Sequence, residues 1–167
     1  MRAIVYEEYG SPDVLNFQEV EKLAPKDNEV LVKVRAASVN AADWHLLRAD
    51  PFLTRLAFGL LRPKYKVLGA DIAGRVEAVG TNVSQFQPGD EIFGDLSGDG
   101  FGGFAEYVCA TEDVLALKPA DTSFEEAAAV PLAAVTALQE LRNKAQVRQG
   151  QKVLINGASG GVGTFAV

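Results

Sequence analysis

The glycine-rich stretch GASGGVG, residues 157–163, combines residue types that could do chemistry. One pattern within it, Gly157-x-Ser159-x-Gly161, matches the nucleophile elbow of hydrolases, in which a serine sits between a strand and a helix. A serine nucleophile needs a general base, which is normally a histidine. The only histidine, His45, lies upstream of the serine, and nothing after Ser159 could supply an acid. The missing partners therefore argue against a hydrolase.

The same stretch also fits the turn that binds a dinucleotide. Ala158-x-Gly160-x-x-Gly163 follows the apolar run QKVLIN, residues 151–156, which is typical of a buried strand in a parallel sheet. Glycines let the backbone approach a pyrophosphate, and the N-terminal end of the next helix favours the anion. A glycine-rich connection that binds no ligand is the alternative interpretation.

A second loop carries oxygen ligands at the spacing of a calcium site. Asp95, Ser97, Asp99, Gly100 and Glu106 match the positions of an EF-hand loop. An EF-hand needs flanking helices, but the residues on both sides of this loop have the pattern of strands. Three further glycines would also leave the ligands loosely held. We therefore predict a flexible loop beside a cleft instead of a calcium site.

Composition and charge exclude several classes of function. The net charge is −6 at pH 7, which argues against a nucleic acid or an anionic membrane as partner. Cys109 is the only cysteine, so neither a disulfide nor a thiolate zinc cluster can form within one chain. No apolar run reaches the ~20 residues that a membrane span needs, and the first residues lack the pattern of a signal peptide. These features predict a cytoplasmic protein.

The first 120 residues have the pattern of short strands separated by turns. In the segment EVLVKVRAASVN, Val30, Val32 and Val34 alternate with Lys33 and Arg35, which is typical of a strand with one buried face. Strands of this length and spacing indicate a small barrel or sandwich. The other predicted strands cover residues 2–8, 15–20, 71–80, 87–94, 102–110 and 114–119, and two helices are predicted at 41–49 and 52–61.

The sequence pattern changes from that of strands to that of helices near residue 122. Ser123 and Glu126 form a capping box, which predicts a helix starting there. Pro131 suits the first turn of a second helix, and Gly150 closes the helical segment. The boundary between the strand-rich part and the helical segment is therefore expected at residues 120–125.

The order of these motifs resembles one family. The segments KVRAASVNAADW, VLGADIAGRVEAVG, FQPGDEIFG, GGFAEYV, AAAVPLAAVTAL and VLINGASGGVG follow the order and spacing of the medium-chain dehydrogenase/reductase superfamily. The chain is most similar to its zinc-independent quinone oxidoreductase (zeta-crystallin-like) branch. The resemblance implies a mainly β GroES-like catalytic domain with short helices at residues 1–122, connecting helices at 123–150, and the first strand and turn of an α/β Rossmann domain at 151–167.

The resemblance also implies a reaction and a site. The full-length protein would transfer hydride from NADPH, or from NADH, to a quinone or an α,β-unsaturated carbonyl. Asn40, His45 and Thr136 would be catalytic, and Asn40 and Thr136 would also contact the cofactor. Asp43 and Asp71 could contribute polar groups or brace the barrel. The pyrophosphate would lie on Ser159, Gly160, Gly161, Val162 and Gly163.

Zinc does not suit the matching residues. The positions that hold the catalytic zinc in zinc-dependent relatives correspond to Asn40, Ala70 and Leu132, and neither a methyl group nor an isobutyl group can bind a metal. We therefore predict no metal site. The apolar segment at residues 50–66 could line a substrate cleft or could simply pack on the barrel.

We expect the chain to be the N-terminal part of a protein about twice its length. The full-length protein would be a homodimer with a small-molecule quinone or enone substrate and no nucleic-acid or membrane partner. The isolated chain is predicted to be inactive in hydride transfer. The alternative is a free-standing GroES-like barrel that acts as a non-catalytic interaction module.

Overall fold

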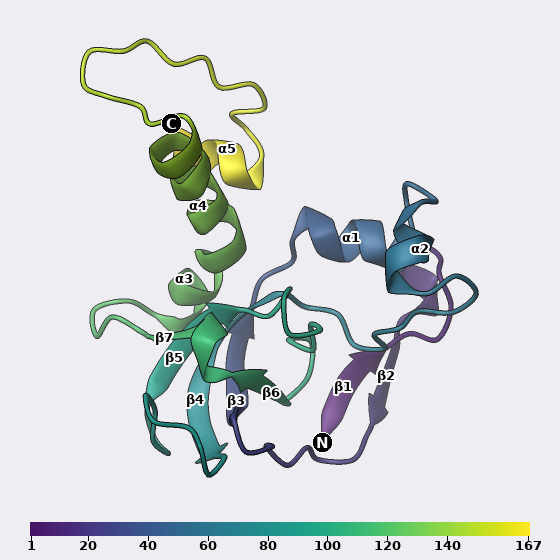
Figure 1. The fold of residues 1–167 in the computed structure, drawn as a ribbon. Coiled ribbons are helices and arrows are strands. Elements are labelled where there is room, and N and C mark those ends of the chain that lie inside the picture. The colour runs from purple at the N-terminus through teal and green to yellow at the C-terminus, as the bar shows by residue number, and fades with distance from the viewer.

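The computed structural model describes residues 1–167 and is built around a five-stranded antiparallel sheet (Figure 1). The sheet order is β6-β3-β4-β5-β7. Its strands are β3 (Glu29–Ala37), β4 (Asp71–Val79), β5 (Glu91–Asp95), β6 (Tyr107–Thr111) and β7 (Leu115–Leu117). A separate hairpin pairs β1 (Arg2–Val5) with β2 (Asn16–Glu19), and a single bridge from Ala3 to Ala105 joins it to the rest. The strands predicted within residues 1–120 are therefore confirmed, and this part of the chain is mainly β, as expected.

The alternating valines of β3 contribute to the core, and Leu31 between them is buried as well. Val30 and Val32 are fully buried, whereas Lys33 and Arg35 are exposed. The register between β3 and β4 shifts on either side of the Val34–Gly74 pair. A Cβ at Gly74 would overlap the carbonyl of Lys33, so this position requires glycine. The main core cluster comprises Val30, Val32, Ile72, Val76, Phe86, Ile92, Leu96, Val108, Ala110 and Leu115.

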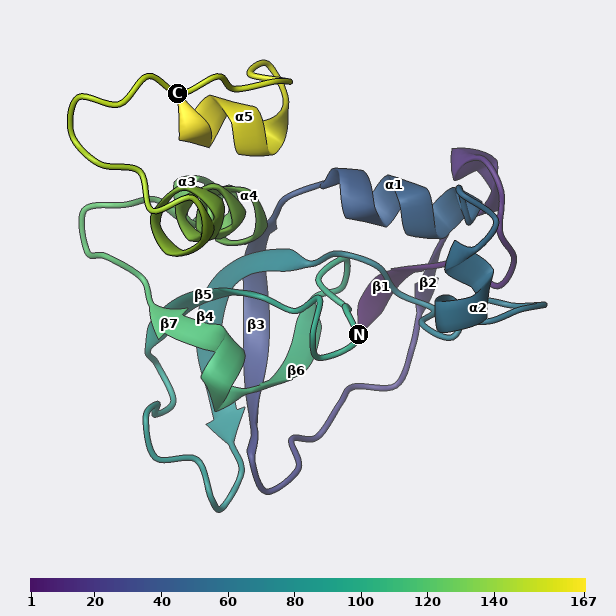
Figure 2. The same ribbon diagram turned by 45° about the horizontal axis from the view of Figure 1, so that its top comes forward.

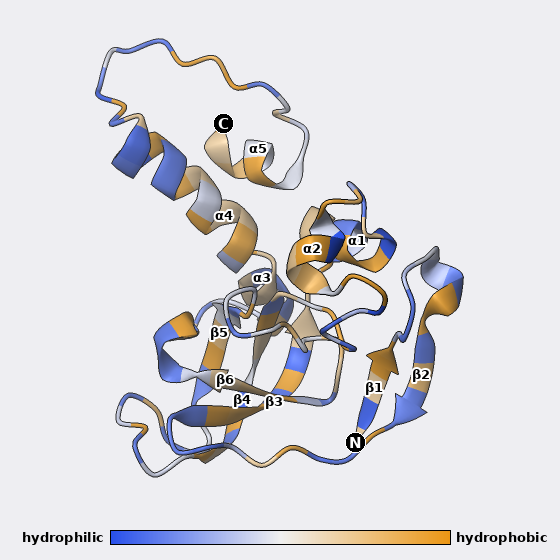
Figure 3. Ribbon diagram, turned by 45° about the vertical axis from the view of Figure 1, so that its right-hand side comes forward, coloured by the Kyte–Doolittle hydropathy of each residue, from blue (hydrophilic) through white to orange (hydrophobic).

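Two helices, α1 (Ala41–Arg48) and α2 (Thr54–Phe58), connect β3 to β4. The helix predicted at residues 52–61 is shorter in the structure, because Gly59 adopts a φ of 116° and its N–H closes the last turn on Arg55. The α2 region is strongly hydrophobic (Figure 3). Its large exposed side chains are Phe52, Leu53, Leu56, Leu60 and Leu61.

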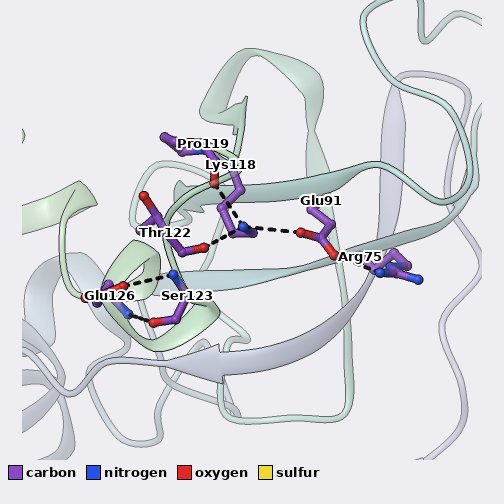
Figure 4. A network of polar contacts seen from close by, with 7 residues as sticks. All are labelled: Arg75, Glu91, Lys118, Pro119, Thr122, Ser123 and Glu126. Carbon is purple, nitrogen blue, oxygen red and sulfur yellow. Dashed lines mark hydrogen bonds and ion pairs between the residues drawn. The ribbon is translucent and has the colours of Figure 1, made fainter.

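A buried lysine holds the end of the sheet against the helices that come after it (Figure 4). The side chain of Lys118 is only 4% exposed and lies 3.2 Å from the Glu91 carboxylate on β5. Its ammonium also donates to the carbonyls of Pro119 and Thr122. The next residue, Ser123, starts α3 (Phe124–Ala128) with the predicted capping box, which is confirmed. The junction near residue 122 is therefore fixed by polar contacts.

The chain then forms α4 (Pro131–Leu138), a π-helical turn η3 (Gln139–Lys144), a long loop and α5 (Gly161–Ala166). In both ribbon views α5 returns to lie beside α4 (Figures 1 and 2). Short 3-10 turns occur at η1 (Pro12–Val14) and η2 (Glu112–Val114). None of the helices combines the length and the hydrophobicity that crossing a bilayer requires.

The strand expected at residues 151–156 is not formed. This segment has no ladder partner, and Leu154 is 96% exposed. A strand is stabilised by hydrogen bonds to a neighbouring backbone. No strand of the structure pairs with residues 151–156, so this segment stays irregular. The glycine turn and the helix after it are present even so.

Candidate functional site

A cleft of about 490 Å³ separates the start of α1 from α4 and α5. Its walls come from three parts of the chain that are far apart in sequence, and Figure 2 shows these elements at one end of the molecule. The lining residues include Val39, Asn40, Leu132, Ile155 and four residues of the glycine turn, Gly160, Gly161, Val162 and Gly163. The structure therefore brings Asn40 and most of the predicted pyrophosphate residues to one cleft. A larger polar hollow of about 730 Å³ near Glu7 and Arg62 contains none of the predicted site residues.

Asn40 stands at the start of α1, where its backbone is extended and the helix begins at the next residue. Its backbone N–H donates to the Asp43 carboxylate at 2.9 Å, and the other oxygen of Asp43 accepts from the Gly69 N–H at 2.9 Å. Asp43 is buried, and burial raises its pKa although these hydrogen bonds oppose the change. Asp43 thus braces α1 against the start of β4 and does not line this cleft.

Asp71 lies behind Asn40 as a fully buried carboxylate. One oxygen accepts from the Asn40 side-chain amide at 3.0 Å and from the Ser38 hydroxyl at 3.2 Å. The other oxygen accepts from the backbone N–H of Leu132, at the N-terminal end of α4, at 3.0 Å. Asn40 also donates to Ser38 at 3.1 Å. Asp71 therefore links β3, α1 and α4 directly beneath the cleft.

The environment of Asp71 disfavours its charge. Burial raises the pKa of this carboxyl to about 6, and the nearby Asp95 carboxylate acts in the same direction. The hydrogen bonds from Asn40, Leu132 and Ser38 act in the opposite direction but do not offset the loss of solvent.

The glycine turn owes its shape to the absence of side chains. Gly157 has a φ of 76°, and a Cβ at Gly163 would overlap the carbonyl of Gly157 and lie 2.7 Å from the Cα of Ala158. The N–H of Gly160 closes the turn on the same carbonyl at 3.0 Å. Ser159 is exposed and does not line the cleft, unlike the rest of the predicted pyrophosphate set. The turn thus brings bare backbone to the cleft wall.

The two other predicted catalytic residues lie away from the cleft lining. The Nδ1 of His45 is 2.6 Å from the carbonyl of Asp50, and its exposed ring stacks edge-on against Trp44 with 4.6 Å between centroids. Since a carbonyl can only accept, Nδ1 carries a proton and Nε2 is the acceptor of the neutral ring. The Thr136 hydroxyl donates to the carbonyl of Leu132 at 2.6 Å, one helical turn from the cleft.

An apolar hollow of about 300 Å³ lies on the opposite side of α1 and shares Val39 with the cleft. Trp44, Leu47 and Phe104 contribute to it. Ser38 is the polar residue at the site that the sequence analysis missed. No motif marks Ser38, because its partner Asp71 is 33 residues away in the chain.

Two of the three positions that correspond to zinc ligands in zinc-dependent relatives line the cleft. Asn40 and Leu132 share the cleft, and Ala70 is fully buried directly before Asp71. The alkyl side chains at two of these three positions offer no donor atom, so the residues do not fit a zinc ion. No three histidine, cysteine, aspartate or glutamate side chains come together as a metal site.

The carboxylates of the calcium-like loop bind separate partners. Asp95 accepts from the Ser97 N–H, and Asp99 accepts from the N–H and hydroxyl of Thr111. Glu106 pairs with Arg2. Two of these partners, Thr111 of β6 and Arg2 of β1, lie outside the loop, so the carboxylates are engaged separately.

Comparison with known proteins identifies the family. Residues 26–120 match the alcohol dehydrogenase GroES-like domain. The chain is 39% identical to the chloroplast envelope quinone oxidoreductase homolog of Arabidopsis thaliana, covering 100% of this chain and 51% of the relative. It is 38% identical to 2-methylene-furan-3-one reductase of Solanum lycopersicum, covering 100% of this chain and 43% of the relative.

A solved structure agrees with this assignment. The quinone oxidoreductase of Coxiella burnetii superposes with a TM-score of 0.88 at 36% identity, covering 99% of this chain and 51% of that one. The chain belongs to the alcohol dehydrogenase GroES-like family, in the quinone oxidoreductase branch of the medium-chain dehydrogenase/reductase superfamily. It spans about half the length of the curated relatives that it matches.

Proposed function

We propose that this chain supplies the catalytic domain and the dinucleotide-binding entrance of an NAD(P)H-dependent reductase of quinones or α,β-unsaturated carbonyls that works without zinc. The observation that carries the proposal is the cleft in which Asn40 faces the glycine turn. The family assignment and the quinone and enone reductases among the relatives support the substrate class. NADPH is the expected cofactor, with NADH as the alternative.

The residues of the cleft fit the two ends of such a cofactor. At one wall the turn residues Gly160, Gly161 and Gly163 carry no side chains, which allows backbone to approach a pyrophosphate. At the other wall Asn40 lies between the end of β3 and the start of α1, where its amide can hydrogen-bond the cofactor or the substrate. When bound, the reduced nicotinamide supplies the hydride.

The remaining predicted residues have more indirect roles. The Thr136 hydroxyl donates to the carbonyl of Leu132 and can at the same time accept a hydrogen bond from a bound cofactor. His45 would carry a proton between solvent and the substrate, since its ring is exposed and its Nε2 has no partner in the structure. The apolar residues Val39, Leu132 and Val162 would exclude water from the cleft.

The decisive experiment uses the full-length protein purified from its native source, with its intact mass measured first. We expect a mass about twice that of this chain, the size of a two-domain enzyme. We also expect oxidation of NADPH on addition of a para-quinone or an enone, undiminished by a zinc chelator. Asn40→Ala should lower kcat/KM by about tenfold or more, which is on the order of one lost hydrogen bond in the transition state. Asn82→Ala, at an exposed turn, is the matched control.

The isolated 167-residue chain should not turn over under the same conditions. Failure of the full-length protein to oxidise either nicotinamide with every quinone and enone tried would overturn the proposal. An intact mass equal to that of this chain would instead favour a non-catalytic interaction module.

A further inference from the structure

Asp71 is the one fully buried carboxylate of the molecule, and it has no cationic partner. A buried charge without a counter-ion is costly and is retained only when several donors satisfy it. Here the donors are the Asn40 amide, the Ser38 hydroxyl and the Leu132 N–H. Two of the three donors belong to residues that line the cleft. This arrangement connects the carboxylate to the cleft rather than to the barrel core.

The chemistry of the carboxylate dictates how the Asn40 amide is oriented. An ionised carboxylate accepts hydrogen bonds and cannot donate them, so the NH₂ group of Asn40 must face Asp71. The carbonyl oxygen of Asn40 then accepts from the backbone N–H of Asp43 in the capping box of α1, and its second lone pair can accept from a ligand in the cleft. A ligand in the cleft therefore meets an acceptor at Asn40, which suits a hydroxyl or an amide N–H.

We propose that Asp71 is a positioning residue that fixes the Asn40 amide with its NH₂ inward and its carbonyl outward, and that locks this orientation to the N-terminal end of α4. The effect on catalysis rests on the proposed function, whereas the orientation itself does not. When Asp71 gains a proton, its hydroxyl can donate to the Asn40 carbonyl, and the amide is free to turn over.

Among the charged groups around Asp71, the Asp95 carboxylate acts on its pKa and raises it. Across the sheet, Asp95 of β5 is its register partner, and Asp43 of α1 is turned towards Gly69. Arg35 of β3 is exposed, α4 carries no charged residue, and Glu126 of α3 is engaged with Ser123. Burial raises the pKa of Asp71 to about 6, so both forms are accessible near neutral pH.

Nuclear magnetic resonance on the 167-residue chain tests the orientation directly. We expect the side-chain NH₂ signals of Asn40 and the amide signal of Leu132 to shift together with one midpoint near the pKa of Asp71. Asp95→Asn should lower that midpoint, because it removes a neighbouring negative charge. Asp71→Asn should abolish the shared transition. If the Asn40 signals do not titrate with those of Leu132 in the unmodified chain, the inference is wrong, whether or not Asp71→Asn folds.

Steady-state kinetics of the full-length protein test whether the orientation of Asn40 affects catalysis. We expect kcat/KM for NADPH to fall on the acid side with the same midpoint, and Asp71→Asn to lose that acid limb together with about tenfold in kcat/KM. Asp95→Asn, the matched control, should stay within about twofold and retain the limb. Turnover with an unchanged acid limb in Asp71→Asn would refute the positioning role alone. A shared transition in the resonance experiment without any turnover would refute the proposed function alone.

Discussion

The stability of the chain should depend on pH through Asp71, and replacing this residue by asparagine should remove that dependence. Burial raises the pKa of Asp71 from its ordinary value of 3.8 to about 6 in the folded state. Between about pH 4 and pH 6 the folded chain therefore binds more protons than the unfolded chain. The contribution of Asp71 to the free energy of unfolding therefore decreases as the pH rises through this window.

The size of the effect is set by the shift. A change of about two pKa units corresponds to about 3 kcal/mol, because each unit is worth about 1.4 kcal/mol. Asp71 is fully buried, so solvent does not screen this contribution at the surface. Asparagine has nearly the same shape and does not titrate, so its own contribution to the free energy of unfolding does not change with pH.

Urea unfolding of the two proteins, followed by the fluorescence of Trp44, provides the assay. The unfolding free energy of the wild type minus that of Asp71→Asn should fall by about 3 kcal/mol between about pH 3 and pH 7.5. Other groups, such as Asp43, titrate in both proteins and cancel in the difference. Parallel pH profiles for the two proteins would refute the reasoning, because they would place the folded-state pKa of Asp71 at its ordinary value.

Three further predictions concern other parts of the molecule. Gly163→Ala should abolish the hydrogen-exchange protection of α5, because its Cβ would overlap the backbone of the preceding turn, and it should leave the unfolding of the barrel unchanged. The control Gly161→Ala should keep that protection, because its Cβ would make an ordinary contact at 3.8 Å. Ser123→Ala should lower the free energy of unfolding by about 1 kcal/mol through loss of the α3 cap, whereas Ser97→Ala should change it by less than about 0.5 kcal/mol in the same urea titration. Burial raises the pKa of the Cys109 thiol to about 11, so iodoacetamide should alkylate it about a hundredfold more slowly than glutathione at the same pH, as followed by mass spectrometry. Equal alkylation rates would contradict a raised pKa for this half-buried thiol.

Local patterns were sufficient for much of the fold. The alternation in residues 29–37 predicts β3 and its buried face, and the capping box at Ser123 predicts the start of α3. Both patterns act within a few residues, so they do not depend on the remainder of the chain. The predicted length of the helix at residues 52–61 was wrong. Gly59 ends α2 in a backbone conformation that the spacing of apolar residues does not reveal.

The candidate site also has one part that the sequence predicts and another that depends on the tertiary structure. The sequence by itself determined the residue types, namely the amide at Asn40 and the glycine turn, because the family motifs contain them. Only the tertiary structure decided that Asp71 holds Asn40 and Leu132 together across 31 and 61 residues of chain. It also decided that residues 151–156 form no strand, because a strand depends on a neighbouring backbone that local sequence does not specify. Burial and hydrogen bonding between distant segments are properties of the folded chain, and they set both the charge of Asp71 and the orientation of the amide that it contacts.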